Sequence, residues 1–98
     1  MIIQLVTRTF SNELEAVAFE SFFCKQWKDL IKNIPNCKLR LIRDNDSQNT
    51  FNALWEFPNS LTQDKVMKLI KKNNKKFQGI IPKKTTNFSG NVIIEYDS

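Results

Sequence analysis

The sequence predicts an α+β fold from the order in which strand-like and helix-like segments follow one another. A strand-like segment opens the chain, a long amphipathic segment follows, two strand-like segments are joined by a polar turn, and a second amphipathic segment precedes a last strand-like one. Strands alternate with a period of two, whereas helices repeat apolar residues three and four positions apart. The order βαββαβ in 98 residues predicts a ferredoxin-like sandwich, in which two helices cover one face of a four-stranded antiparallel sheet of order 4-1-3-2.

Length and composition indicate a single ferredoxin-like domain over residues 1–98. Hydrophobic residues make up 41% of the chain and include eight Phe and two Trp, which is enough to form one core. The first residues do not resemble a secretion signal, and no apolar run reaches the ~20 residues of a membrane span. We therefore expect a soluble, cytoplasmic protein with no membrane partner.

The first strand and the first helix are the clearest elements. Residues 2–10 are β-branched and apolar on both parities, which is typical of a central strand covered on both faces. Asn12 as an N-cap, with Glu15 three residues later, predicts the start of the helix. Apolar residues then recur at spacings of three to five, so this helix must bury one side against the sheet. The predicted stripe is Leu14, Val17, Ala18, Phe22, Trp27, Leu30, Ile31 and Ile34.

Two further strands, 37–43 and 50–57, are predicted on either side of a polar turn. The odd-numbered residues of 50–57 are three aromatic residues and one alanine, and we expect the helices to cover this parity. The opposite face then mixes charged, polar and aliphatic side chains: Lys38, Arg40, Ile42, Asn52, Leu54 and Glu56. One parity of the first strand completes this face, and the sequence leaves open which it is: Gln4, Val6 and Arg8, or Ile3, Leu5 and Thr7.

The second helix is predicted to begin at Ser60, which forms a capping box with Gln63, and to end at Gly79. The last strand is expected at 91–96, where the sequence is again apolar. The basic segment before it is expected to be irregular. Residues 78–90 are left open, because Ile80, Ile81 and Pro82 could form an extended edge segment or a loop that packs its isoleucines on the core.

Several kinds of chemistry are excluded because the chain has no histidine. Serine and cysteine nucleophiles that depend on an imidazole base are excluded, as are sites that need a histidine metal ligand. The two glycines are too few for a phosphate-binding loop. Cys24 and Cys37 are interpreted as small buried hydrophobic residues, and two cysteines alone leave a disulfide open. We therefore predict no metal and no cofactor, and no catalytic residue can be named.

Four residues are candidates for a ligand pocket: Arg8, Asn52, Trp55 and Glu56. Arg8 and Glu56 are expected to be cross-strand neighbours, as are Arg40 and Asn52. A desolvated Glu56 paired with a cation could orient a ligand or act as a base. Such pairs also occur simply to make an interface soluble and specific, so the sequence leaves open whether the protein is an enzyme.

The segment 51–58, with Trp55 followed by Glu56 and a helix directly after it, resembles the dimeric α/β-barrel group, which includes antibiotic-biosynthesis-type monooxygenases. This resemblance implies a homodimer in which two sheets meet face to face. It also implies a small organic ligand held in a cavity near the sheet and the helices. Haem-degrading members of the group use a histidine that this chain lacks, so no haem site and no catalytic residue is carried over.

The alternative function is a nucleic-acid- or protein-binding module that uses the basic region from Lys71 to Lys84. The chain has a net charge of +5, and a basic cluster can track phosphates. Lysines at a helix C-terminus also complement the helix dipole, and a lysine- and asparagine-rich composition is typical of AT-rich genes. An RNA-recognition domain is disfavoured because the aromatic residues of the third strand share the parity expected in the core. The candidate residues are Lys71, Lys72, Lys75, Lys76, Lys83 and Lys84.

Overall fold

The computed structural model describes residues 1–74 and 80–98 and contains the predicted elements in the predicted order. Its strands and helices are β1 (Ile2–Thr9), α1 (Glu13–Leu30), a short 3₁₀ helix (Ile31–Asn33), β2 (Lys38–Arg43), β3 (Thr50–Phe57), α2 (Ser60–Asn74) and β4 (Lys84–Asn91). The predicted end of the second helix at Gly79 lies outside the described residues.

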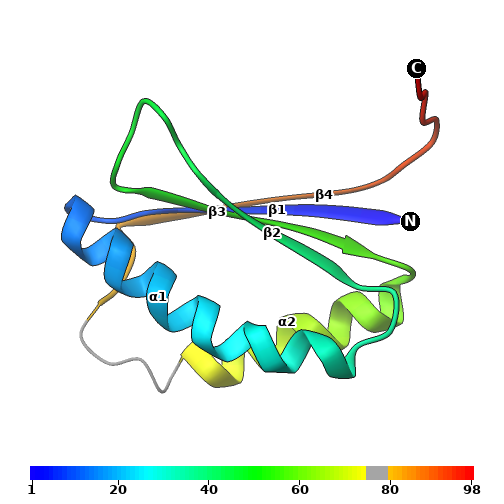
Figure 1. Cartoon of the computed structure of the whole chain (residues 1–98), viewed down its shortest axis with the longest axis horizontal. Helices are drawn as coiled ribbons and strands as arrows, with labels where there is room; N and C mark the ends of the chain where they lie inside the picture. The colour runs from blue at the N-terminus through cyan, green and yellow to red at the C-terminus, as the bar shows by residue number, and fades with distance from the viewer. Residues whose placement is uncertain (75–79) are drawn as a thin grey trace.

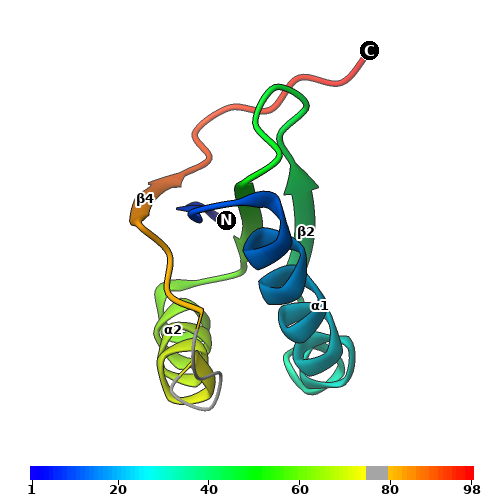
Figure 2. The same cartoon turned by 90° about the vertical axis from the view of Figure 1, so that its left-hand side faces the viewer.

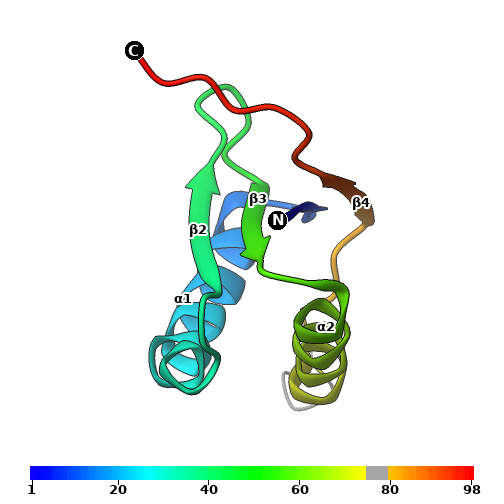
Figure 3. The same cartoon turned by 90° about the vertical axis from the view of Figure 1, so that its right-hand side faces the viewer.

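The four strands form one antiparallel sheet in the order β2-β3-β1-β4. This is the predicted 4-1-3-2 order read from the other edge, so the ferredoxin-like α+β fold is confirmed. Both helices lie on the same side of the sheet (Figure 1). Viewed from either end, α1 lies below the β2 side and α2 below the β4 side (Figures 2 and 3).

The core lies between the sheet and the helices and is mainly aromatic. The inward residues of β3, predicted to face the helices, are at most 2% exposed: Phe51, Ala53, Trp55 and Phe57. From α1, Phe23 packs edge-on against both Phe51 and Trp55. Trp27 also meets Trp55 edge-on, with 4.9 Å between ring centroids. The most continuous aromatic packing therefore joins α1 to β3.

The structure decides which parity of β1 faces the helices. Gln4, Val6 and Arg8 are buried on the helix side, while Ile3 and Leu5 are half-buried on the opposite side. The sequence could not distinguish the two because both parities contain aliphatic residues. Two polar side chains of the central strand are therefore enclosed in an otherwise apolar layer.

Both helices begin at asparagine caps. The Glu15 backbone N–H donates to Asn12 Oδ1 at 2.9 Å, as predicted. At the start of α2 the cap is Asn59, whose Oδ1 accepts from the Thr62 N–H at 2.9 Å. The predicted capping box of Ser60 and Gln63 is wrong, because Asn59 and not Ser60 caps the helix. The Gln63 side chain instead extends toward the sheet, where it donates to Gln4.

The predicted last strand is misplaced. β4 is Lys84–Asn91, and residues 92–98 form neither helix nor strand. β4 is an edge strand whose polar side chains find partners: Asn87 accepts from Gln4 at 3.1 Å, and Ser89 accepts from Gln63 at 3.0 Å. These hydrogen bonds stabilise a strand of mostly polar residues. The apolar pattern of residues 92–96 therefore did not indicate where the last strand lies.

Residues 80–82, for which an extended edge or a loop was left open, form neither helix nor strand and are a loop. Ile80 packs against the core, whereas Ile81 is exposed. Residues 78 and 79 lie outside the described residues.

Candidate functional site

The face of the sheet away from the helices carries a band of aliphatic and aromatic side chains, which we call the open face. Successive residues of a strand point to opposite faces, and paired residues share a face. Leu5 at the centre of the sheet pairs with Leu54 on one side and Phe88 on the other. Phe88 is 66% exposed. The apolar members of the open face are Ile3, Leu5, Ile42, Leu54 and Phe88.

The Phe88 ring lies along its own strand on the open face. A Cβ added to Gly90 would lie 3.5 Å from this ring, an ordinary van der Waals contact. The Phe88 side chain faces solvent. No helix of the described part of the chain covers it (Figure 1).

Polar residues flank the apolar band on two sides. Glu56 Oε2 lies 3.4 Å from Arg40 and 3.8 Å from Lys38, at ion-pair distance but without hydrogen-bond geometry. On the other side, Thr7 donates a 2.7 Å hydrogen bond to Asn52. The open face is therefore apolar in the middle and polar at its margins, which is typical of protein interfaces.

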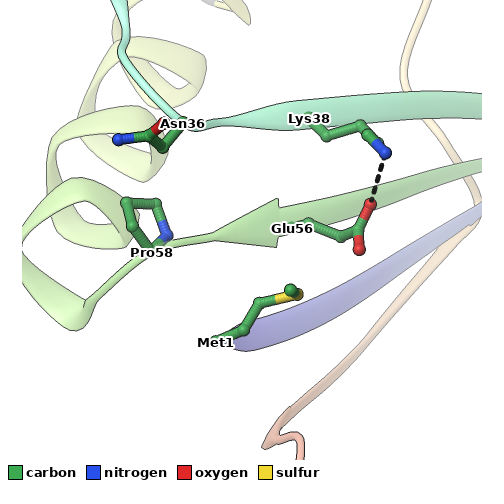
Figure 4. A pocket seen from close by; sticks show the side chains of 5 residues that line it. All are labelled: Met1, Asn36, Lys38, Glu56 and Pro58. Carbon is green, nitrogen blue, oxygen red and sulfur yellow. Dashed lines mark ion pairs between the residues drawn. The ribbon is translucent and has the colours of Figure 1, made fainter. Parts of the chain in front are cut away.

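A cavity of about 270 Å³ lies beside the Lys38–Glu56 ion pair. Figure 4 shows the two charged side chains pointing toward each other from neighbouring strands, with Met1 on the adjacent strand. Asn36 and Pro58 complete the lining. The cavity opens at the end of the sheet. Of the four predicted pocket residues, only Glu56 lines it.

The four predicted pocket residues are divided between the two faces of the sheet. Asn52 and Glu56 lie on the open face, whereas Arg8 and Trp55 are buried on the helix side. The predicted Arg8–Glu56 neighbour pair is wrong, because Arg8 pairs with Phe51 and Glu56 pairs with Ile3.

The predicted Arg40–Asn52 neighbour pair is also wrong, since Arg40 pairs with Leu54. These two errors have one cause: the register of the strands cannot be read from the alternation of apolar residues alone.

Arg8 is the most unusual group on the helix side. It is 6% exposed, and its guanidinium carbon lies 5.3 Å from the centroid of the Phe19 ring and 5.6 Å from that of Phe23. Burial lowers the pKa of Arg8 to about 10, which leaves it protonated at neutral pH. Its NH1 atom is buried and has no hydrogen-bond partner in the described structure.

Trp55 is enclosed as a core residue but keeps an unpaired donor. It is fully buried between Trp27 and Phe57. Its indole Nε1 has no hydrogen-bond partner among the described residues. Buried donors of this kind usually have a hydrogen-bond acceptor in the protein or in water. Arg8 NH1 and Trp55 Nε1, both in the layer between sheet and helices, lack such an acceptor among the described residues.

A groove of about 340 Å³ opens between α1 and β2 at the edge of this layer. Its lining residues are Cys24, Trp27, Lys28, Ile31, Leu39 and Leu41. The prediction that both cysteines are buried is wrong: Cys24 is exposed and Cys37 is half-buried, and both are free thiols. Burial of the thiol and the nearby Glu20 raise the pKa of Cys24, so it is not an activated nucleophile.

Sequence reasoning missed the partners of Arg8 and of Gln4. The predicted stripe of the first helix was wrong at its start: Leu14 and Val17 are exposed, whereas Phe19 and Phe23, which the stripe did not include, are buried. Nothing local marks these two rings as the ones that contact a cation. Gln63 was interpreted as a helix cap, yet its amide bridges Gln4 and Ser89. A buried glutamine in a strand with apolar neighbours is the one sequence signal that could have pointed to this network.

The basic residues of the alternative function are only partly described. Lys71 and Lys72 are exposed in the last turn of α2, and Lys83 and Lys84 are exposed before and at the start of β4. Lys75 and Lys76 lie outside the described residues. This arrangement matches the helix-dipole explanation as well as a binding patch, and it does not favour the alternative.

Neither a metal site nor a membrane-spanning helix occurs among the described residues. Residues 1–74 and 80–98 contain no group of three acidic, cysteine or histidine side chains that could hold a metal ion. The same residues include no helix with the length and apolar character needed to cross a membrane.

Comparison with known proteins gives matches to structures only. No protein-family model matches the chain, and no curated protein matches it in sequence. A candidate antibiotic biosynthesis monooxygenase from Deinococcus radiodurans aligns with a TM-score of 0.82 at 10% identity, over 100% of this chain and 98% of that one. A dimeric ferredoxin-like protein from an uncultured marine organism aligns with a TM-score of 0.71 at 16% identity, over 100% of both chains.

An antibiotic biosynthesis monooxygenase aligns with a TM-score of 0.69 at 13% identity, over 96% of this chain and 100% of that one. At these identities the likeness concerns the fold. The fold-level resemblance expected from the sequence is therefore confirmed: the chain has the fold of dimeric ferredoxin-like proteins and antibiotic biosynthesis monooxygenases.

Proposed function

We propose that the protein is a homodimer in which the open faces of two sheets pack against each other, and that it binds a small organic molecule between its sheet and helices. The observation that carries the dimer is the uncovered apolar band centred on Leu5, Leu54 and Phe88. Large exposed apolar patches bordered by polar residues mark interaction surfaces. A second copy supplies an identical band, and a two-fold interface requires such a self-complementary surface.

The C-terminal segment supports the same pairing. Residues 92–98 leave the sheet on the side away from the helices (Figure 1). Their large side chains are exposed in the single chain, with Ile93 at 90% and Tyr96 at 88%. The Val92 N–H still donates to the Met1 carbonyl at 3.0 Å, which anchors the segment at the border of the open face. A second copy packed on this face would cover these side chains.

Two features support a ligand between the sheet and the helices. The groove between α1 and β2 gives access to the edge of this layer beside Trp27. The unpaired donors of Arg8 and Trp55 lie inside the layer. The solved structures with this fold include proteins described as antibiotic biosynthesis monooxygenases, which agrees with a small organic ligand.

The dimer is tested by solution mass, measured by light scattering after size exclusion at low and high salt. We expect a salt-resistant mass of twice 11.5 kDa, because apolar contacts are not screened. Phe88→Glu should yield a folded monomer, since it places a charge in the interface. Leu14→Glu is the matched control: Leu14 is 82% exposed on α1, so this variant should remain dimeric. A monomeric wild-type chain would exclude the proposed dimer.

A further inference from the structure

Two polar side chains of β1 are buried on the helix side, and they differ in how they are satisfied. Gln4 Nε2 donates to Asn87 at 3.1 Å, and Gln4 Oε1 accepts from Gln63 at 2.9 Å. Arg8, four residues later on the same face, has a buried NH1 with no partner in the described part of the chain. The fold therefore supplies partners for a buried amide but not for the full donor set of a buried cation.

The surroundings of the guanidinium hold it in place without neutralising its charge. The rings of Phe19 and Phe23 lie 5.3 and 5.6 Å from its central carbon, close enough for cation–π attraction. Burial lowers the pKa of Arg8, and Arg8 takes part in none of the ion pairs between the described residues. A buried charge is costly unless it is paired. An anion that enters the layer would provide the missing partner.

We propose that Arg8 is the anchor of a binding site for a small organic monocarboxylate, whose carboxylate meets the guanidinium and whose apolar body lies at the β4 edge of the aromatic layer, where Thr85 is exposed. This inference rests on the proposed function, because it names the ligand class of the layer between sheet and helices. A guanidinium binds a carboxylate through two parallel hydrogen bonds. The NH1 atom of Arg8, which has no partner among the described residues, can donate one of them.

Charge balance favours a monocarboxylate over a phosphate. One guanidinium neutralises one negative charge, and a phosphate dianion would bring a second charge into an aromatic layer. The Trp55 Nε1, the other unpaired donor, faces the same layer and is neutral. The Phe23 ring contacts both residues, at 5.6 Å from Arg8 and 6.4 Å from the Trp55 ring. A ligand with one acidic group and an apolar body matches these neighbours.

The β4 side of Arg8 offers the shorter approach from solvent. Arg8 pairs with Thr85 across the β1–β4 ladder, so both side chains share the helix side of the sheet. Thr85 is exposed, whereas Phe51, the partner of Arg8 on the β3 side, is 2% exposed. A carboxylate is therefore expected to reach the guanidinium past the Thr85 hydroxyl.

The test measures thermal stabilisation of the full chain by benzoate and hexanoate, compared with benzamide and hexanamide as neutral analogues and with inorganic phosphate. At 10 mM, a ligand at about ten times its Kd should raise the Tm by about 4 °C or more. We expect this rise for at least one carboxylate and less than about 1 °C for its amide and for phosphate. Arg8→Met should remove the response, and Arg43→Met, the same change at an exposed arginine, should keep it.

The outcomes separate this inference from the proposed function. Equal stabilisation by carboxylate and amide would leave ligand binding intact and exclude recognition by Arg8. No stabilisation by any carboxylate, a larger effect of phosphate, or an undiminished response in Arg8→Met would overturn the assignment. If Arg8→Met does not fold, Arg8→Lys keeps the charge without the planar donor pair. Its affinity for the stabilising carboxylate should fall at least about tenfold, and an unchanged affinity would contradict the proposal.

Discussion

The two faces of the sheet differ in what covers them, although the same strands form both. On the helix side, the inward residues of β3 are at most 2% exposed. On the open face, the alternate residues of the same strand are half-buried, and Phe88 beside them on β4 is 66% exposed. The aromatic core on the helix side is buried within one chain, whereas the apolar band of the open face would be buried only by a second surface. Stability should therefore depend on the first face within each chain and on the second only through association.

The largest effect is expected from truncating the covered face. Trp55→Ala removes a fully buried indole that contacts Trp27 and Phe57. We expect a loss of about 3–5 kcal/mol in the free energy of unfolding, because the surrounding rings cannot close the cavity. This is a large part of the ~5–15 kcal/mol that a small domain has. Denaturant unfolding followed by far-UV circular dichroism measures the change.

Leu54→Ala is the comparison for this prediction, since Leu54 is the adjacent residue on the other face of β3. Its cost should vary with protein concentration if the open face is buried only in a dimer. Its cost should also be smaller when measured in the monomeric Phe88→Glu background. If both variants lose the same free energy of unfolding at every protein concentration, the two faces do not differ in how they stabilise the protein, and the prediction is wrong.

The second effect concerns the C-terminal segment. Deleting residues 92–98 removes four exposed apolar side chains, namely Val92, Ile93, Ile94 and Tyr96. We expect the dissociation constant of the dimer to rise by about 100-fold, equivalent to ~2.7 kcal/mol, while each chain stays folded because β4 ends at Asn91. Sedimentation equilibrium measures the constant. An unchanged constant would mean that this segment lies outside the interface.

The fold could be predicted because its signals are local. The alternation of Phe51, Ala53, Trp55 and Phe57 identified the covered face of β3 before any register was known, and the apolar stripe of α1 identified the helix that packs on it. The position of β4 could not be predicted in this way. Its residues are polar, and the bonds that satisfy them come from Gln4 and Gln63, far away in the sequence.

The candidate site was predictable only in part, for a related reason. Arg8 and Trp55 were named as candidates, and Trp55 lies on the face that the parity of β3 predicted, but the face of Arg8 depends on the register of β1 against β3. Because β1 is apolar on both parities, either face was compatible with its pattern. The surroundings of Arg8, formed by Phe19 and Phe23, depend on how α1 lies across the sheet. Side-chain composition alone does not fix that geometry.

A third, smaller effect is expected in the polar network on the helix side. Gln63→Leu removes the donor to Gln4 Oε1 and to Ser89. The loss should be about 1–2 kcal/mol in the free energy of unfolding, because a largely buried carbonyl oxygen is left without a partner. Gln48→Leu, the same change at an exposed residue of the β2–β3 turn, is the control and should have little effect. Denaturant midpoints of the two variants should differ clearly.

The smallest effect is expected at the ion pairs on the margin of the open face. Lys38→Gln removes one of the two cations near Glu56, at 3.8 Å, and leaves Arg40 at 3.4 Å. The Lys38 side chain is 61% exposed, so solvent screens the interaction, and we expect less than about 0.5 kcal/mol in the monomeric Phe88→Glu background. The difference should vanish at 1 M salt, where the Debye length is about 3 Å. A loss above 1 kcal/mol that persists at high salt would mean that Glu56 needs Lys38 as a buried partner. The margin of the open face would then stabilise each chain on its own, as the covered face does.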